Sequence, residues 1–127
     1  MNRRRWLPGL LCAAFFFGGC TYAPADAYTD FLADADVEMR FSICIDDIEK
    51  GRDSFYTVGE LRALERDLEG GYAVEDEAAR EATRLYQQAA RELRAYLESE
   101  ERREEDLDAA KASLAAAARK EDEVQSA

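Results

Sequence analysis

The feature that most restricts the fold is a long stretch without proline. From residue 28 to residue 127 the chain contains no proline and is rich in Ala, Leu, Glu and Arg, which are common in helices. Proline disrupts the interior of a helix because it lacks an amide hydrogen, so its absence permits long helices. The 127 residues suffice for one small domain. We therefore predict an all-α fold: a small three-helix bundle with a long C-terminal helix.

Glycines and capping residues divide this stretch into three predicted helices, over residues 25–50, 58–69 and 75 to about 121. Gly51 closes the first helix. Thr57 and Glu60 form the pattern of a capping box before the second helix, and Gly70-Gly71 stops it. The third helix has no stop signal near its middle.

The first segment also has a pattern typical of a strand. From Val37 to Asp46, apolar and polar residues alternate strictly, which would allow an α+β fold with a β-hairpin around residues 37–58. The same residues fit two helical stripes. One stripe contains Val37, Phe41, Cys44, Ile45 and Ile48, and the other contains Tyr28, Phe31, Leu32, Ala35 and Met39. We favour the helix because an isolated hairpin is only marginally stable.

The third segment changes character along its length. An apolar stripe over residues 82–97 is followed by nine polar residues, 98–106. Leu107 and Leu114 are then seven residues apart, and each is followed three residues later by an alanine, Ala110 or Ala117. This spacing is typical of a weak coiled-coil seam. This pattern predicts a bundle over residues 28–103 and a charged, alanine-rich extension over 104–127. The extension would project into solvent or onto a partner, and a frayed tail is the alternative.

The N-terminus has the three parts of a secretory signal. A basic start with three arginines precedes an apolar stretch over residues 6–17 and then small residues before Cys20. The apolar stretch is shorter than the roughly 20 residues that a membrane-spanning helix needs. An ordinary signal peptide and an uncleaved anchor are the alternatives that remain open.

The sequence Phe17-Gly18-Gly19-Cys20 resembles the lipobox of bacterial lipoproteins, with phenylalanine in place of the usual leucine. The resemblance implies that residues 1–19 are removed and that Cys20 carries acyl chains on its sulfur and its amine. Two or more such chains make a stable membrane anchor. Residues 20–27 would then form a lipidated tether. Thr21 is not the aspartate that retains many lipoproteins in the inner membrane, which favours the outer membrane of the bacterial cell envelope.

The net negative charge of the chain restricts the kinds of partner that it can bind. Without residues 1–19 the chain has 14 basic and 28 acidic residues, so its net charge is −14. Such a body is repelled by nucleic acids and by anionic headgroups. Cys44 would be the one cysteine left besides Cys20, and between two isoleucines it is expected to be buried. A disulfide-linked or coiled-coil homodimer is the less favoured alternative.

The residues that usually carry catalysis are sparse. The chain has no histidine, which removes the most common general base and transition-metal ligand. Acidic pairs such as Asp46-Asp47 lack the loop glycines of a calcium site and are typical of a solvated helix face. Ser42, Cys44 and Lys50 have no third group to orient them as a nucleophile and a base. We therefore expect no enzymatic activity, no cofactor and no bound metal.

Two functions remain. The first is a structural or protein-interaction module that presents Phe55, Tyr56, Tyr72, Leu107 and Leu114 to another envelope protein, since aromatic residues are common interface anchors. The second is a periplasmic binding or chaperone-like protein that holds an apolar ligand or client between helices. The first needs a flat patch or an extended helix end, and the second needs a concave pocket. The aromatic residues could instead cover the open end of the bundle.

Overall fold

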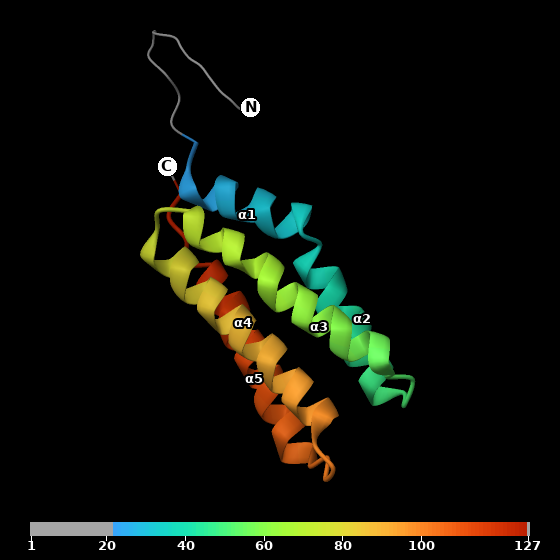
Figure 1. The fold of residues 1–127 in the computed structure, drawn as a ribbon. Helices are drawn as coiled ribbons and strands as arrows, with labels where there is room; N and C mark the ends of the chain where they lie inside the picture. The colour runs from blue at the N-terminus through green and yellow to red at the C-terminus, as the bar shows by residue number, and fades with distance from the viewer. Residues whose placement is uncertain (1–21, 127) are drawn as a thin grey trace, which may run out of the picture.

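The computed structural model describes residues 22–126, and these residues are helical without any strand. The helices are α1 (Pro24–Asp34), α2 (Val37–Glu49), α3 (Phe55–Asp67), α4 (Glu77–Glu98) and α5 (Glu104–Glu121), with a 3₁₀ helix, η1 (Leu68–Ala73), after α3 (Figure 1). The all-α prediction is confirmed, and the alternative hairpin over residues 37–58 is wrong. No described helix is both long and apolar enough to span a bilayer.

The first predicted helix is broken into α1 and α2. Asp36 adopts a left-handed backbone conformation with a φ of 52° and ends one helix where the next begins. Asp is one of the few residues other than Gly that tolerate this conformation. The bend turns most of both predicted stripes toward one core, so that Tyr28 and Leu32 of α1 are buried together with Val37 and Phe41 of α2. Met39, predicted in the second stripe, is exposed instead. Gly51 follows α2 with a φ of 68°, as its predicted role requires.

The start and the end of α3 differ from the prediction. The cap is formed by Ser54 and Thr57: the Ser54 N–H donates to Thr57 Oγ1 at 3.0 Å, and the Tyr56 N–H donates to Ser54 Oγ at 3.2 Å. After α3 the chain continues through η1, which contains Gly71. A Cβ at this position would lie 2.4 Å from Thr83 Oγ1, so the glycine permits close packing of η1 against α4.

The third predicted helix is two antiparallel helices. The polar residues near its middle form a turn between α4 and α5, and α5 folds back along α4 (Figure 1). Leu107, Ala110 and Ala117 of α5 are buried, and Val124 beyond α5 is buried as well. The prediction that residues 104–127 project from a bundle of residues 28–103 is therefore wrong. The weak seam packs against α4 within the same chain.

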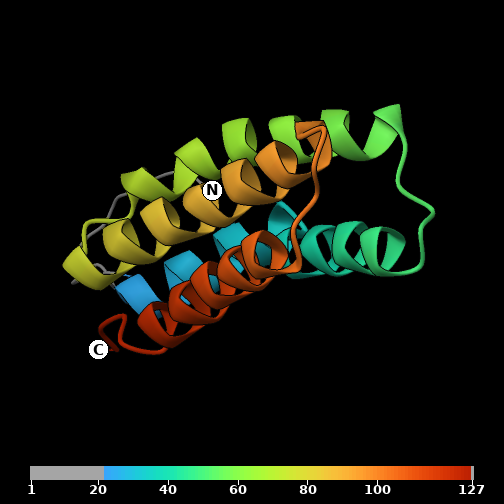
Figure 2. The same cartoon turned by 90° about the horizontal axis from the view of Figure 1, so that it is seen from below.

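The helices form two layers. The layer of α3 and α4 covers a second layer that contains α1, α2 and α5 (Figure 2). Buried side chains from all five helices make one core between Tyr28 and Val124. Leu61, Leu64 and Leu68 are fully buried, as their shared face predicts, and so is Leu93 of α4.

The two ends of the described chain are tied together. The Ala25 N–H donates to the Gln125 carbonyl at 2.9 Å, and the Gln125 N–H donates to Asp76 Oδ1 at 3.4 Å. Helix α1 begins at Pro24, and the first turn of a helix is a position that favours proline. Residues 24–27, the second half of the predicted tether, are therefore helical.

Candidate functional site

A groove separates α5 from the arm formed by α1 and α2. Helix α5 packs along α4 and makes no extensive contact with α1 or α2. The groove between them has a volume of about 660 Å³, within the range typical of ligand sites. Its lining is mostly apolar. The apolar lining residues are Leu32, Ala33, Val37, Phe41, Ile45, Tyr86, Leu114, Ala115 and Ala118.

Two stacked aromatic rings form part of the lining. Phe41 of α2 and Tyr86 of α4 lie 6.0 Å apart between ring centroids, at an interplanar angle of 29°. The Tyr86 hydroxyl donates to Glu121 Oε1 at 2.5 Å. Burial, together with the Glu121 carboxylate, raises the pKa of Tyr86 above its ordinary value. The phenol therefore stays neutral and donates to the carboxylate, so the buried part of the site carries no charged tyrosine.

Charged residues line the rest of the groove. Glu38 of α2, with Glu121 and Asp122 at the end of α5, contribute three carboxyl groups, against one cation, Lys111. Lys111 Nζ pairs with the Glu49 carboxylate across the space between α5 and α2, and this hydrogen bond raises the pKa of Lys111. The groove thus has apolar walls and an acidic rim, with its one lysine already paired.

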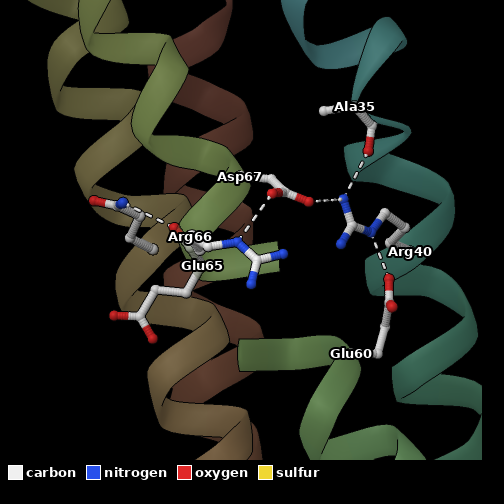
Figure 3. Close-up of polar contacts among 7 residues, drawn as sticks. Ala35, Arg40, Glu60, Glu65, Arg66 and Asp67 are labelled. Atoms are coloured by element: carbon white, nitrogen blue, oxygen red, sulfur yellow. Dashed lines mark hydrogen bonds and ion pairs between the residues drawn. The ribbon is translucent and has the colours of Figure 1, made fainter. Parts of the chain in front are cut away.

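Arg40 holds α2 against α3 on the opposite side of α2 from this groove. Its guanidinium donates to Glu60 at 2.5 Å, to Asp67 at 3.1 Å and to the Ala35 carbonyl at 3.1 Å (Figure 3). Partial burial opposes the charge, but the hydrogen bonds to Glu60 and Asp67 raise the pKa of Arg40. The Ala35 carbonyl belongs to the bend, so one side chain fixes both the bend and the α2–α3 pairing.

Cys44 is a buried free thiol, as the sequence predicts. Burial, with smaller contributions from the nearby Glu60 and Asp47 carboxylates, raises the pKa of the Cys44 thiol to about 11. The thiolate is the reactive form of cysteine. Cys44 is therefore suited to packing, and an intermolecular disulfide through it would require α2 to move.

The predicted aromatic residues have different surroundings. Phe55 and Tyr56, the aromatic tip, lie in the first turn of α3 with 86% and 84% of their surfaces exposed. They do not cover the end of the bundle. Ile43 of α2 is also exposed and lies beside Tyr56 in a shallow depression. Tyr72 is partly buried, and its hydroxyl donates to Gln87 at 2.7 Å, so it packs η1 against α4.

The two leucines predicted as contact residues do not project. Leu107 is in the core, and Leu114 packs against the core and lines the groove. Cys20 and the lipobox lie outside the described residues. The structure therefore brings Leu114 to the candidate site, while the aromatic tip lies at another place in the molecule.

Sequence reasoning missed the other lining residues because they come from three distant segments. Ala115 gives no signal among the many alanines of α5. Ala118 belongs to the narrow stripe of Leu107 and Leu114, and Val37 and Phe41 are expected only in the core. Apolar residues on one face of a helix indicate burial but not what covers them. The groove exists because the turn between α4 and α5 places α5 opposite α2, and the spacing of apolar residues does not predict that turn.

The described residues offer apolar contacts in the groove and no metal site. Among residues 22–126, no three His, Cys, Asp or Glu side chains gather closely enough to hold a metal ion. In comparisons with known proteins, no family model, no curated protein and no solved structure matches this chain. The arrangement of the described side chains is suited to holding an apolar molecule.

Proposed function

We propose that this protein is a non-enzymatic binding module of the bacterial cell envelope, anchored by lipid on Cys20, and that its groove holds an apolar ligand. The observation that carries the proposal is the concave apolar space of about 660 Å³ between α5 and the α1–α2 arm. A binding protein needs such a space, whereas the extended helix end that an interaction module would use is folded into the core.

A neutral fluorescent probe tests the groove. The chain from Cys20 to Ala127 contains every core residue and is expected to bind N-phenyl-1-naphthylamine with a rise in fluorescence. Ala115→Trp places a large ring in the groove and should weaken binding at least tenfold. The matched control is Ala112→Trp, on the exposed part of the same helix and outside the groove lining. Equal binding by both variants would contradict the proposal.

The anchor is tested separately. The lipobox resemblance of Phe17-Gly18-Gly19-Cys20 supports lipidation, and an outer-membrane location follows from Thr21 by the same resemblance. Cys20→Ser should abolish labelling by fatty acid in cells and leave the precursor uncleaved. Release of a normally processed soluble protein from this variant would show that an ordinary signal peptidase acts here.

A second function is supported by the aromatic tip. Phe55 and Tyr56 are almost fully exposed, and aromatic side chains are common anchors of protein interfaces. The start of α3, which carries them, lies at the end of the molecule opposite the start of α1, so they would face away from the membrane (Figure 1). A photo-crosslinking residue at position 55 in intact cells should give a discrete adduct, and the same residue at exposed Glu100 should not. Identical patterns from both sites would argue against an interface.

A further inference from the structure

The groove has the size of one extended chain. Its lining on α5 runs from Lys111 to Asp122, which at 1.5 Å per residue is roughly 16 Å. That length limits a ligand that lies along α5 within the groove. The Lys111–Glu49 pair also crosses from α5 to α2. One acyl chain, which spans about half of a 30 Å hydrocarbon core, matches the length.

The charges of the groove disfavour an anionic ligand. Glu38, Glu121 and Asp122 line it, and its one cation is paired with Glu49. The whole chain has a net charge of −11. A free fatty acid or an anionic phospholipid would therefore be repelled as it approached. Acyl chains joined to a protein by ester or amide bonds carry no charge and are not repelled.

An acyl chain attached to Cys20 would be such an uncharged chain, and Cys20 is only a few residues from the groove. Cys20 precedes Ala25 by five residues, a distance of at most about 17 Å if extended. Ala25 is bonded to Gln125, and Thr29, one helical turn later, already lines the groove together with Asp122. An acyl chain on Cys20 is therefore within reach of the end of the groove at Thr29 and Asp122.

We propose that the groove holds one acyl chain of the protein's own lipid anchor when the anchor is outside the bilayer. The inference rests on the proposed binding function and on lipidation of Cys20. The apolar walls would keep the chain from water during passage between membranes, and the chain would leave the groove when a bilayer receives it.

A synthetic anchor tests the inference. The chain from Cys20 to Ala127 is alkylated on Cys20 with N-dodecylmaleimide, and with N-ethylmaleimide as the control. The background carries Cys44→Ala, so that only one thiol is present. A short tether gives an effective concentration in the millimolar range. The tethered dodecyl chain should therefore compete with N-phenyl-1-naphthylamine, so that the dodecyl form binds the probe about 10- to 100-fold more weakly than the ethyl form. Because this competition takes place within one molecule, the ratio should not depend on the protein concentration.

A second attachment site distinguishes occupation of the groove from general effects of the dodecyl chain. Arg62 is exposed on α3, which contributes no residue to the groove lining. Arg62→Cys in a Cys20→Ser, Cys44→Ala background, labelled with the same reagent, should bind the probe like the ethyl form. Equal loss from both attachment sites, or no loss from Cys20, would overturn the inference and leave the groove function intact. Failure of the ethyl form to bind the probe would overturn both.

Discussion

At the scale of single residues, Arg40 connects α2 to both α3 and the bend after α1. It is 18% exposed and donates to two carboxylates of α3 and to the end of α1. Charge-assisted hydrogen bonds of this kind are stronger than neutral ones. We expect Arg40→Met to lower the free energy of unfolding by about 1–3 kcal/mol in urea titration. Arg66→Ala is the control, since Arg66 is 75% exposed and pairs only with Asp67, and it should cost at most about 0.5 kcal/mol.

Tyr28 links α1 to α4 and should make stability depend on alkaline pH. Its hydroxyl lies 2.8 Å from Thr83 Oγ1, and burial raises its pKa from 10.0 to about 12. Below pH 10 the phenol is neutral in the folded and the unfolded state, and its contribution is complete. As the pH rises from 10 to 12, the unfolded state loses its proton first, so the free energy of unfolding should fall by about 2–3 kcal/mol from this group.

Two variants isolate this contribution. Tyr28→Phe should cost about 1 kcal/mol at pH 7, because Thr83 keeps its bond to the Ala79 carbonyl. It should also make the decline between pH 10 and 12 smaller by the share of Tyr28, while Tyr86, whose pKa burial also raises, keeps its own share. Tyr56→Phe, whose ring is exposed, should leave the profile unchanged. Cys44, with a pKa of about 11, contributes a separate fall from about pH 9, so both variants are measured in a Cys44→Ala background. An unchanged profile in Tyr28→Phe would contradict the assignment.

At the scale of elements, α5 is expected to be essential to the fold. Truncation after Arg103 would remove the buried side chains of Leu107, Ala110 and Ala117 and expose the face of α4 that they cover. A fully buried large apolar side chain contributes about 1.5–3 kcal/mol. We therefore expect a loss of cooperative unfolding, or a thermal midpoint at least about 15 °C lower by circular dichroism. A chain that ends at Ser126 keeps every described residue and should unfold normally.

Much of the fold could be predicted because helix faces have a regular spacing. The stripe of Val37, Phe41, Cys44 and Ile48 is the buried face of α2, and the three leucines after residue 60 are buried as predicted. The breaks could not be predicted in the same way. Asp36 has a left-handed backbone because two apolar faces must meet one core, and this demand is set by the tertiary packing.

The candidate site was less predictable than the fold. The sequence predicts Leu114 as a contact residue of a projecting extension, whereas the structure packs it against the core and places it in the groove lining. Its neighbours across the groove on α2 cannot be identified from spacing. The nine polar residues 98–106 predict a solvated helix, whereas only residues 99–103 among them form the turn between α4 and α5. A polar run shows that a segment is not buried, and it does not show whether the chain reverses there. The groove depends on that reversal.

At the scale of the whole molecule, charge and shape act together on what the groove accepts. Without residues 1–19 the net charge is −14, and the groove lining includes Glu38, Glu121 and Asp122 against one paired lysine. A neutral ligand binds with the full favourable free energy of burying its apolar surface. For an anionic ligand of the same shape, repulsion by the carboxylates offsets part of that free energy. The aromatic tip lies at the other end of the α1–α2 arm and is not part of this selection (Figure 1).

Two probes that share one aromatic skeleton measure this selection. N-phenyl-1-naphthylamine is neutral, and 8-anilinonaphthalene-1-sulfonate adds a single negative charge. At distances of several ångströms near a protein surface, each unpaired carboxylate adds roughly 0.5–1 kcal/mol of repulsion. We expect the anionic probe to bind about tenfold or more weakly at low salt. Because salt screens exposed charges, the difference should narrow in 0.5 M sodium chloride.

A substitution on the rim identifies the source of the selection. Glu38→Gln removes one carboxylate from the groove and should improve binding of the anionic probe several-fold, while binding of the neutral probe stays the same. Glu105→Gln changes the net charge equally but lies in the first turn of α5, away from the lining. If both variants improved anionic binding equally, the net charge of the protein would account for the selection. An effect confined to Glu38→Gln would assign it to the acidic rim, because a nearby charge is screened less than a distant one.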